Sequence, residues 1–151
     1  MWTLPAWTLA LLLGNTAPEA PPAPAYDAAL AERLGADERG MRSYVLVILK
    51  TGPTPVPEGA ERDAMFAGHF ANIQRLADAG QLAAAGPLDK VDGWRGMFIL
   101  AVDSIEAAQA LVATDPVIQH GEMVAEYHTL YSSAALMLIP ETHRQLVKPA
   151  E

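Results

Sequence analysis

The stretch RDAMFAGHFANIQRLADAGQLAAAGPL, residues 62–88, decides the fold that this sequence predicts. It is typical of a long helix over residues 58–79 that is ended by Gly80 in a left-handed conformation. A short strand over residues 82–85 then ends at a Gly-Pro pair. The preceding run SYVLVILK, residues 43–50, predicts a strand with two apolar faces. A helix between two such strands packs its apolar side against their sheet.

One residue of the long helix differs in kind from its neighbours. His69 falls inside the apolar stripe that the helix forms at about 100° of rotation per residue. The other members of the stripe are Phe66, Phe70, Ile73, Leu76 and Ala77. A titratable side chain that points at a core needs a polar partner. The sequence offers Asp115, in the tripeptide Thr-Asp-Pro, as that partner.

The later elements complete a regular pattern. Predicted strands over residues 94–102 and 122–131 flank a helix over residues 104–114, which Asp103 and Glu106 would open as a capping box. The order of elements is then strand, helix, strand, strand, helix, strand. This order predicts the α+β class with a ferredoxin-like fold, in which one antiparallel four-stranded sheet carries both helices on one face.

The other face of that sheet needs a cover. Two helices cannot cover both faces, although the first and third strands are apolar on both. We expect a second copy of the chain to fill this role, in a homodimer that packs through the sheet faces. The alternative is that the N-terminal helix and residues 134–139 fold back over the open face.

The chain of 151 residues suits one domain with an extension at each end. Residues 41–133 form the predicted domain, residues 26–40 a helical appendage and residues 134–151 a C-terminal extension. Residues 1–25 combine an apolar run too short to span a bilayer with a proline-rich break and a small-x-small site, which is typical of a signal peptide. No Lys or Arg precedes the run, so a disordered tail is the alternative. A signal peptide implies an exported protein, periplasmic or secreted, and a tail a cytoplasmic one.

Composition excludes several classes of function. A net charge of −8 disfavours nucleic acid and an anionic membrane surface as partners. The absence of cysteine excludes thiol nucleophiles and zinc-thiolate sites, and the sequence has no phosphate loop or serine-hydrolase motif. His120 and His128 could join His69 and Asp115 around a metal ion, but their spacing fits no compact ligand motif. We therefore predict neither a metal nor a cofactor.

Three motifs occur in the order found in a known family. They are HFANIQRLADAGQLAAAGPL, RGMFIL and SIEAAQALVATDPVIQHG. Over about residues 43–131 the chain resembles the YCII-related family, in which a His-bearing helix is followed by a Gly-Pro and a later Asp-Pro. The resemblance implies a dimeric α+β barrel of ferredoxin-like units and an active site formed by His69 and Asp115. It also implies a small-molecule ligand, because a few relatives act on chlorinated or hydroxylated rings and lactones, as dehydrochlorinases or isomerases.

His69 is the candidate catalytic residue, because an imidazole can donate or accept a proton near neutral pH. Asp115 would orient the ring and stabilise its protonated form. The structural alternative is a core histidine that only hydrogen-bonds a buried group. Asp115 also has a structural role open to it, as the N-cap of a short turn with Pro116 at the first position. The two roles are compatible, because a carboxylate has several lone pairs.

Four further residues are candidates for substrate binding. Arg62 could meet an anionic substrate, and the alternative is a solvated arginine at the start of a helix. Gly86 and Pro87 form either a pocket wall or only the end of a strand. Gly96, in the middle of a strand, predicts a bulge or a close approach to the backbone.

These residues support hypotheses of different classes. In the first, the chain is a cofactor-independent lyase or isomerase in which His69 and Asp115 transfer a proton on a small ring or enol compound. The pocket would lie between the sheet and the long helix. In the second, the same pocket binds a small molecule within a dimer without chemistry. An oxygenase on the related dimeric barrel is a weaker third option, because nothing in the sequence suggests a haem or flavin site.

Overall fold

The computed structural model describes residues 22–149, and its elements follow the predicted order with small changes in their bounds. The strands are β1 (Met41–Thr51), β2 (Leu82–Pro87), β3 (Trp94–Leu100) and β4 (Met123–Ser133). The helices are α1 (Ala28–Leu34), α2 (Ala60–Asp78), α3 (Ile105–Val112), α4 (Pro116–Gln119) and α5 (Ile139–Leu146), with the 3-10 helices η1 (Val91–Gly93) and η2 (Ala134–Leu138).

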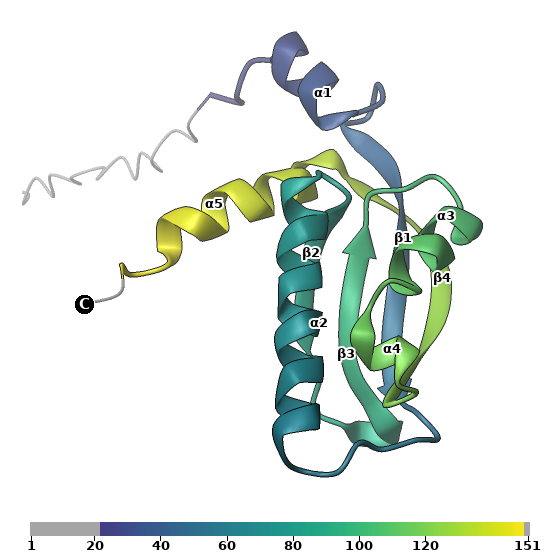
Figure 1. The fold of residues 1–151 in the computed structure, drawn as a ribbon. Helices are drawn as coiled ribbons and strands as arrows, with labels where there is room; N and C mark the ends of the chain where they lie inside the picture. The colour runs from purple at the N-terminus through teal and green to yellow at the C-terminus, as the bar shows by residue number, and fades with distance from the viewer. Residues whose placement is uncertain (1–21, 150–151) are drawn as a thin grey trace, which may run out of the picture.

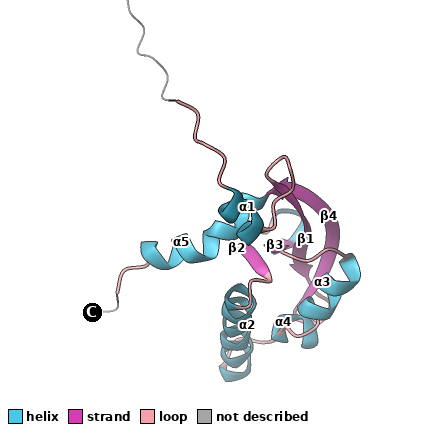
Figure 2. Cartoon of the chain, turned by 90° about the horizontal axis from the view of Figure 1, so that it is seen from above, coloured by secondary structure: helices cyan, strands magenta, loops and turns pink. Residues whose placement is uncertain are grey.

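The four strands form one antiparallel sheet in the order β2-β3-β1-β4. Helices α2, α3 and α4 lie on one face of it (Figures 1 and 2). Alternate residues of β1, namely Val45, Val47 and Leu49, join a core cluster with Leu76 of α2 and Val112 of α3. The predicted ferredoxin-like α+β fold is therefore confirmed.

The long helix α2 ends where the sequence predicts and buries a slightly different face. Gly80 directly follows its C-cap and has a left-handed φ of 68°. The buried residues of the helix are Met65, His69, Asn72 and Leu76. Phe70 of the predicted stripe is instead 64% exposed, so its assignment to the core was wrong. The buried side of α2 is rotated toward Asn72 because the polar partner shared by His69 and Asn72 lies there.

Helix α3 begins with a different cap from the one predicted. Ser104 has an extended backbone, and its hydroxyl oxygen accepts the Ala107 N–H at 3.1 Å, so Ser104 is the N-cap. The capping box of Asp103 and Glu106 was therefore wrong. Serine and aspartate are about equally good N-caps. Ser104 takes the role because it directly precedes Ile105, the first residue of the helix.

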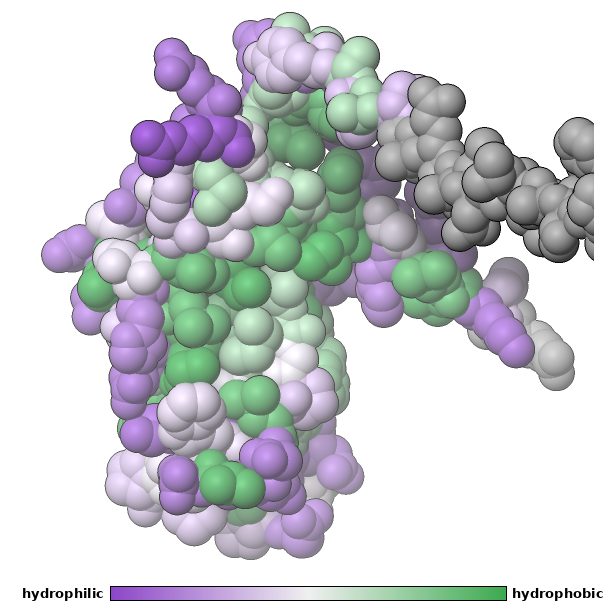
Figure 3. Space-filling view, turned by 180° about the vertical axis from the view of Figure 1, so that it is seen from behind, coloured by the Kyte–Doolittle hydropathy of each residue, from purple (hydrophilic) through white to green (hydrophobic). Residues whose placement is uncertain are grey.

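Among residues 22–149, the chain covers the opposite face of the sheet at one end only. The η2 segment lies against α1, β1 and β2, and the nearby Tyr44 is buried and donates its hydroxyl to the Ser133 carbonyl oxygen at 2.9 Å. Elsewhere apolar side chains gather on this face (Figure 3). Leu46 is half-buried there, and Val124 is 44% exposed. The fold-back alternative thus accounts for one end of the face, and the dimer stays a prediction.

Both extensions have helical structure. Helix α1 forms the N-terminal appendage, while α5 continues from η2 beyond the sheet and pairs Arg144 with Asp78 of α2 at 3.2 Å. Most of the predicted signal peptide or tail, residues 1–21, lies outside the described residues. None of the helices within residues 22–149 is long and apolar enough to cross a membrane.

Candidate functional site

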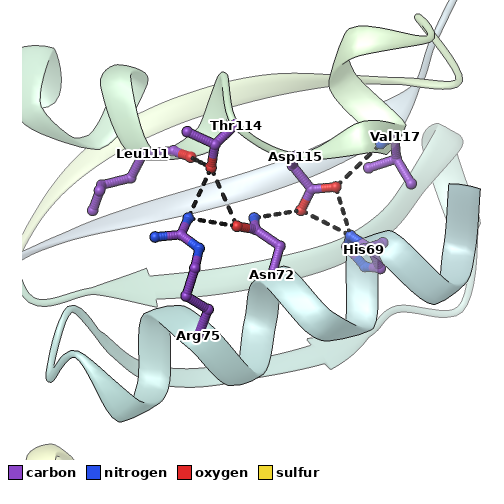
Figure 4. A network of polar contacts seen from close by, with 7 residues as sticks. All are labelled: His69, Asn72, Arg75, Leu111, Thr114, Asp115 and Val117. Carbon is purple, nitrogen blue, oxygen red and sulfur yellow. Dashed lines mark hydrogen bonds and ion pairs between the residues drawn. The ribbon is translucent and has the colours of Figure 1, made fainter.

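The structure brings His69 and Asp115 together. The imidazole Nδ1 lies 2.9 Å from each carboxylate oxygen of Asp115, which is completely buried (Figure 4). Asp115 is also the N-cap of α4, because its Oδ1 accepts the Val117 N–H at 3.1 Å and Pro116 stands at the first helical turn. The contact with His69 and the predicted N-cap role therefore coexist in one side chain.

A close contact between two helices makes this pairing possible. Gly68 precedes His69 on α2, and a Cβ added to it would lie 2.9 Å from Cγ of Pro116 on α4. Real Cβ atoms almost never approach another heavy atom so closely. The missing side chain at Gly68 therefore lets α2 come near enough to α4 for the imidazole to reach Asp115.

A third polar residue, Asn72, holds the pair in place from one turn farther along α2. Its Nδ2 donates to Asp115 at 3.3 Å, and its Oδ1 accepts from Arg75 at 2.6 Å and from the Thr114 hydroxyl at 3.2 Å (Figure 4). Asn72 is not among the site residues predicted from the sequence. Its spacing of three from His69, which puts both on one side of the helix, was the signal that could have found it.

The ring of His69 is enclosed by aromatic residues. Phe98 of β3 stacks against it at 6.0 Å between centroids, and Phe66 meets it edge-on at 6.1 Å. Phe70 lies at 5.4 Å. Because Asp115 accepts the Nδ1–H, the nitrogen left for a reaction is Nε2. The contact with Asp115 and the aromatic packing therefore hold the ring in one orientation.

The ring of His69 lines a cavity of about 460 Å³ between α2 and the sheet. This volume falls in the range typical of small-molecule sites, and most of the lining is aromatic or aliphatic. Three of the predicted binding residues, Gly86, Pro87 and Gly96, are part of the lining. A second cavity of about 240 Å³, between α2, β2 and α5, contains neither His69 nor Asp115.

Gly96 lies where two strands come close together. A Cβ at this position would lie 3.1 Å from the Gly86 carbonyl oxygen, and the pairing of β1 with β3 shifts register next to it, between Leu49 and Lys50. The predicted bulge or close approach at Gly96 is therefore present.

Arg62, the fourth predicted binding residue, lies outside the cavity lining. Its guanidinium donates to the Val56 carbonyl oxygen at 2.8 Å and pairs with Glu122 at 2.9 Å. The cationic residues that do line the cavity are Arg95 and Lys90, both missed in the sequence analysis. Arg95 could have been suspected from its place beside Gly96, because a charged residue interrupts an apolar strand there.

Glu122 is the second buried acidic residue, and it lies between the two arginines. Arg62 approaches its Oε1 at 2.9 Å and Arg95 at 3.4 Å, while Oε2 accepts the Val56 N–H at 2.7 Å. Burial raises the pKa of the Glu122 carboxyl, but the Val56 N–H and the two arginines outweigh burial and hold that pKa below its ordinary value. Glu122 is therefore a fixed negative charge.

The other histidines considered for a metal site are placed elsewhere. His120 lies 3.8 Å from Glu61, and His128 lies 2.7 Å from Glu126 on β4. Within residues 22–149, no three His, Cys, Asp or Glu side chains are grouped as ligands of one metal ion.

The fold and the cavity together define a class: ferredoxin-like α+β proteins with a buried His–Asp pair beside a largely apolar cavity. The model of the YCII-related domain matches residues 43–129, over half of the chain, and the chain therefore belongs to the YCII-related family. Two similar relatives are both described as "Protein YciI", one from Escherichia coli O6:H1 and one from Shigella flexneri. Each is 39% identical over 61 residues, a match that covers 35% of this chain and 62% of the relative's length.

Proposed function

We propose that this chain is a cofactor-independent lyase or isomerase that uses His69 for proton transfer on a small ring or enol compound. One observation carries the proposal: the imidazole lines an apolar cavity, while its Nδ1 lies 2.9 Å from the buried Asp115 carboxylate. A ring held in this way presents only Nε2 to a ligand. Asp115 then stabilises the imidazolium that forms when Nε2 takes up a proton.

The proposed step balances without a further reactant. Nε2 of His69 removes a proton from a carbon next to a carbonyl or enol group, and the electron pair left behind forms a new double bond. In a lyase step this pair expels a leaving group, such as chloride, from the neighbouring carbon. In an isomerase step the imidazolium returns the proton to a different carbon. Phe66 and Phe98, which pack on the imidazole, would keep water away from it.

Turnover of chlorinated hydroquinones and enol lactones tests the proposal, with chloride release and migration of the double bond followed directly. We expect His69→Gln to abolish turnover while its urea-unfolding transition stays cooperative. Exposed His143 on α5 provides the matched control, and His143→Gln should turn over like the wild type. Activity that survives His69→Gln would show that His69 is not the catalytic residue.

The rival proposal is a dimer that binds a small molecule at this cavity without chemistry. It predicts that the same compounds bind to the wild type and are recovered unchanged. A ¹⁵N spectrum of the imidazole adds a separate criterion. Asp115→Asn should change the protonation pattern of Nδ1 and Nε2 if the two residues are coupled in solution. An unchanged spectrum would show that the pair does not act together.

We also propose that the open sheet face pairs two copies of the chain. Its apolar side chains, with Leu46 half-buried and Val124 44% exposed, support this arrangement. Sedimentation should give a dimer at micromolar concentration, and Leu46→Lys should give a monomer. The control Gln109→Lys, on the exposed side of α3, should remain dimeric. A monomeric wild type would contradict the proposal.

For residues 1–25 we propose removal as a signal peptide during export. The mass of the mature protein tests this, because cleavage after residue 25 leaves Tyr26 as the first residue. A mass that includes residues 1–25 after expression in a secreting host would contradict it.

A further inference from the structure

The end of the cavity at the start of β3 carries more positive than negative charge. Arg95 and Lys90 line it, and within the described part of the chain no carboxylate does. Glu122 lies behind Arg95 and is shared with Arg62, so this group has two positive charges and one negative charge. Glu58 also approaches Arg62, at 3.4 Å, but its side chain is 93% exposed and water screens it. One positive charge therefore remains uncompensated beside an apolar cavity.

The two arginines differ in how Glu122 holds them. Arg62 pairs with Oε1 at 2.9 Å and also donates to the Val56 carbonyl oxygen at 2.8 Å. Both terminal nitrogens of Arg95 approach the same oxygen only at 3.4 Å. A guanidinium has five N–H donors, and a short bidentate pair with a carboxylate uses two of them. Arg95 is therefore oriented by Glu122 and keeps donors for a ligand.

The surroundings make an anion the fitting ligand. The net charge of −8 disfavours the binding of anions by the chain as a whole, whereas the two cations of the cavity lining favour it at this site. The apolar walls strengthen that attraction, because they lower the local dielectric. A neutral ligand would leave the group formed by Arg62, Arg95 and Glu122 with one more positive than negative charge beside the apolar walls.

Distance along the sheet limits the size of the ligand. Arg95 lies three residues before Phe98, which stacks on His69, and three residues of a strand span about 10 Å. A single ring with one acid group fits between the two ends. Its ring would contact the apolar lining, which includes Phe66 and Phe98, with the reacting carbon toward Nε2 of His69.

We propose that the ligand of this cavity is a small cyclic carboxylate whose acid group is bound by Arg95, with Lys90 in support. This inference rests on the proposed function for its reacting end at His69. It adds the substrate class, a ring acid, and a specificity-determining residue, Arg95. Glu122 acts through Arg95 as a positioning residue.

Binding of benzoate and of its neutral analogue benzamide tests the proposal by titration calorimetry at constant ionic strength. We expect benzoate to bind about tenfold more tightly than benzamide, because only the carboxylate pairs with a guanidinium. Arg95→Gln should weaken benzoate about tenfold or more and leave benzamide unchanged. Lys90→Gln should weaken benzoate about threefold, as expected for a supporting charge that is more exposed.

Controls separate this inference from the proposed function. Arg33→Gln, which removes an exposed arginine of α1, should bind benzoate like the wild type. His69→Gln should keep benzoate binding and lose turnover, so the failure of catalysis and the failure of anion binding are distinct results. Equal affinity for benzoate and benzamide, or no binding at about 10 mM benzoate, would overturn the proposal. If Arg95→Gln does not fold, Lys90→Gln and a loss of benzoate affinity with added salt decide the question.

Discussion

Two buried carboxylates, Asp115 and Glu122, lie in the same short segment around α4 and have different partners. Each accepts one backbone N–H, Asp115 at 3.1 Å and Glu122 at 2.7 Å. Asp115 otherwise contacts a titratable imidazole and a neutral amide. Glu122 contacts two guanidinium groups, which do not titrate in proteins.

The partners of the two carboxylates, His69 and Arg95, line opposite ends of what the proposal treats as one cavity. At the His69 end, the partner of the carboxylate is an imidazole, the side chain to which we assign the proposed proton transfer. At the Arg95 end, the lowered pKa of Glu122 keeps its carboxyl ionised at neutral pH beside two guanidinium groups, and we assign anion binding to this end. Asp115 and Glu122 are similarly buried, and the difference between them comes from their partners, an imidazole for Asp115 and two guanidinium groups for Glu122.

Asp115→Ala should have the largest effect on stability. The change leaves buried donors on His69, Asn72 and Val117 without an acceptor, and we expect the free energy of unfolding to fall by about 4 kcal/mol. Urea denaturation measures the loss. Asp115→Asn keeps an oxygen that can cap α4 and should lose about half as much. A loss below about 1 kcal/mol for the alanine variant would contradict the importance of this network.

Gly52→Ala tests the backbone at the Glu122 end. The added Cβ would overlap the Gly121 carbonyl oxygen and lie 2.8 Å from the carbonyl carbon of Glu122, so backbone atoms would have to move. We expect the free energy of unfolding to fall by about 3 kcal/mol, at the upper end of the cost of overpacking a core. Gly86→Ala is the matched control, because its Cβ would meet nothing within 4 Å. Equal stability of the two variants would show that the close approach at Gly52 is absent in solution.

Glu122→Gln replaces the fixed charge by a neutral group of the same shape. We expect the free energy of unfolding to fall by about 2 kcal/mol at neutral pH, because two arginines lose their anionic partner. The pKa of Glu122 is lowered in the folded state from the ordinary 4.5, so its contribution is complete well above pH 4.5 and disappears as the pH falls through the lowered value. Unfolding curves of the wild type and the variant should therefore converge in acid. A constant difference at all pH values would contradict the lowered pKa.

Gly68→Ala should have the smallest effect and should act at the His69 end. Its Cβ would press on the Pro116 ring at 2.9 Å, while alanine is a better helix former than glycine, so we expect a net loss of about 1 kcal/mol. The ¹⁵N signals of His69 should change, because the helices separate and the contact with Asp115 lengthens. Gly68→Ser, which is larger, should increase both effects. Unchanged signals in both variants would show that Gly68 does not control this pairing.

Much of the fold could be predicted because its signals are local. The strand at residues 43–50, the left-handed stop at Gly80 and the order of elements all depend on neighbours within a few residues. The errors arose where two local choices were nearly equal. Ser104 and Asp103 are both good N-caps, and Phe70 has the right spacing for the stripe although it lies at the rim of the cavity.

The sequence by itself determined the order of strands and helices and the presence of His69 on the buried side of α2, since periodicity and turn chemistry are properties of short segments. It also pointed to Asp115, through a motif of the family. Only the tertiary structure decided that Asn72 supports this pair and that Glu122 lies between Arg62 and Arg95. The physical reason is that a buried charge is paired by residues distant in sequence, and their proximity is set by how helices and strands pack.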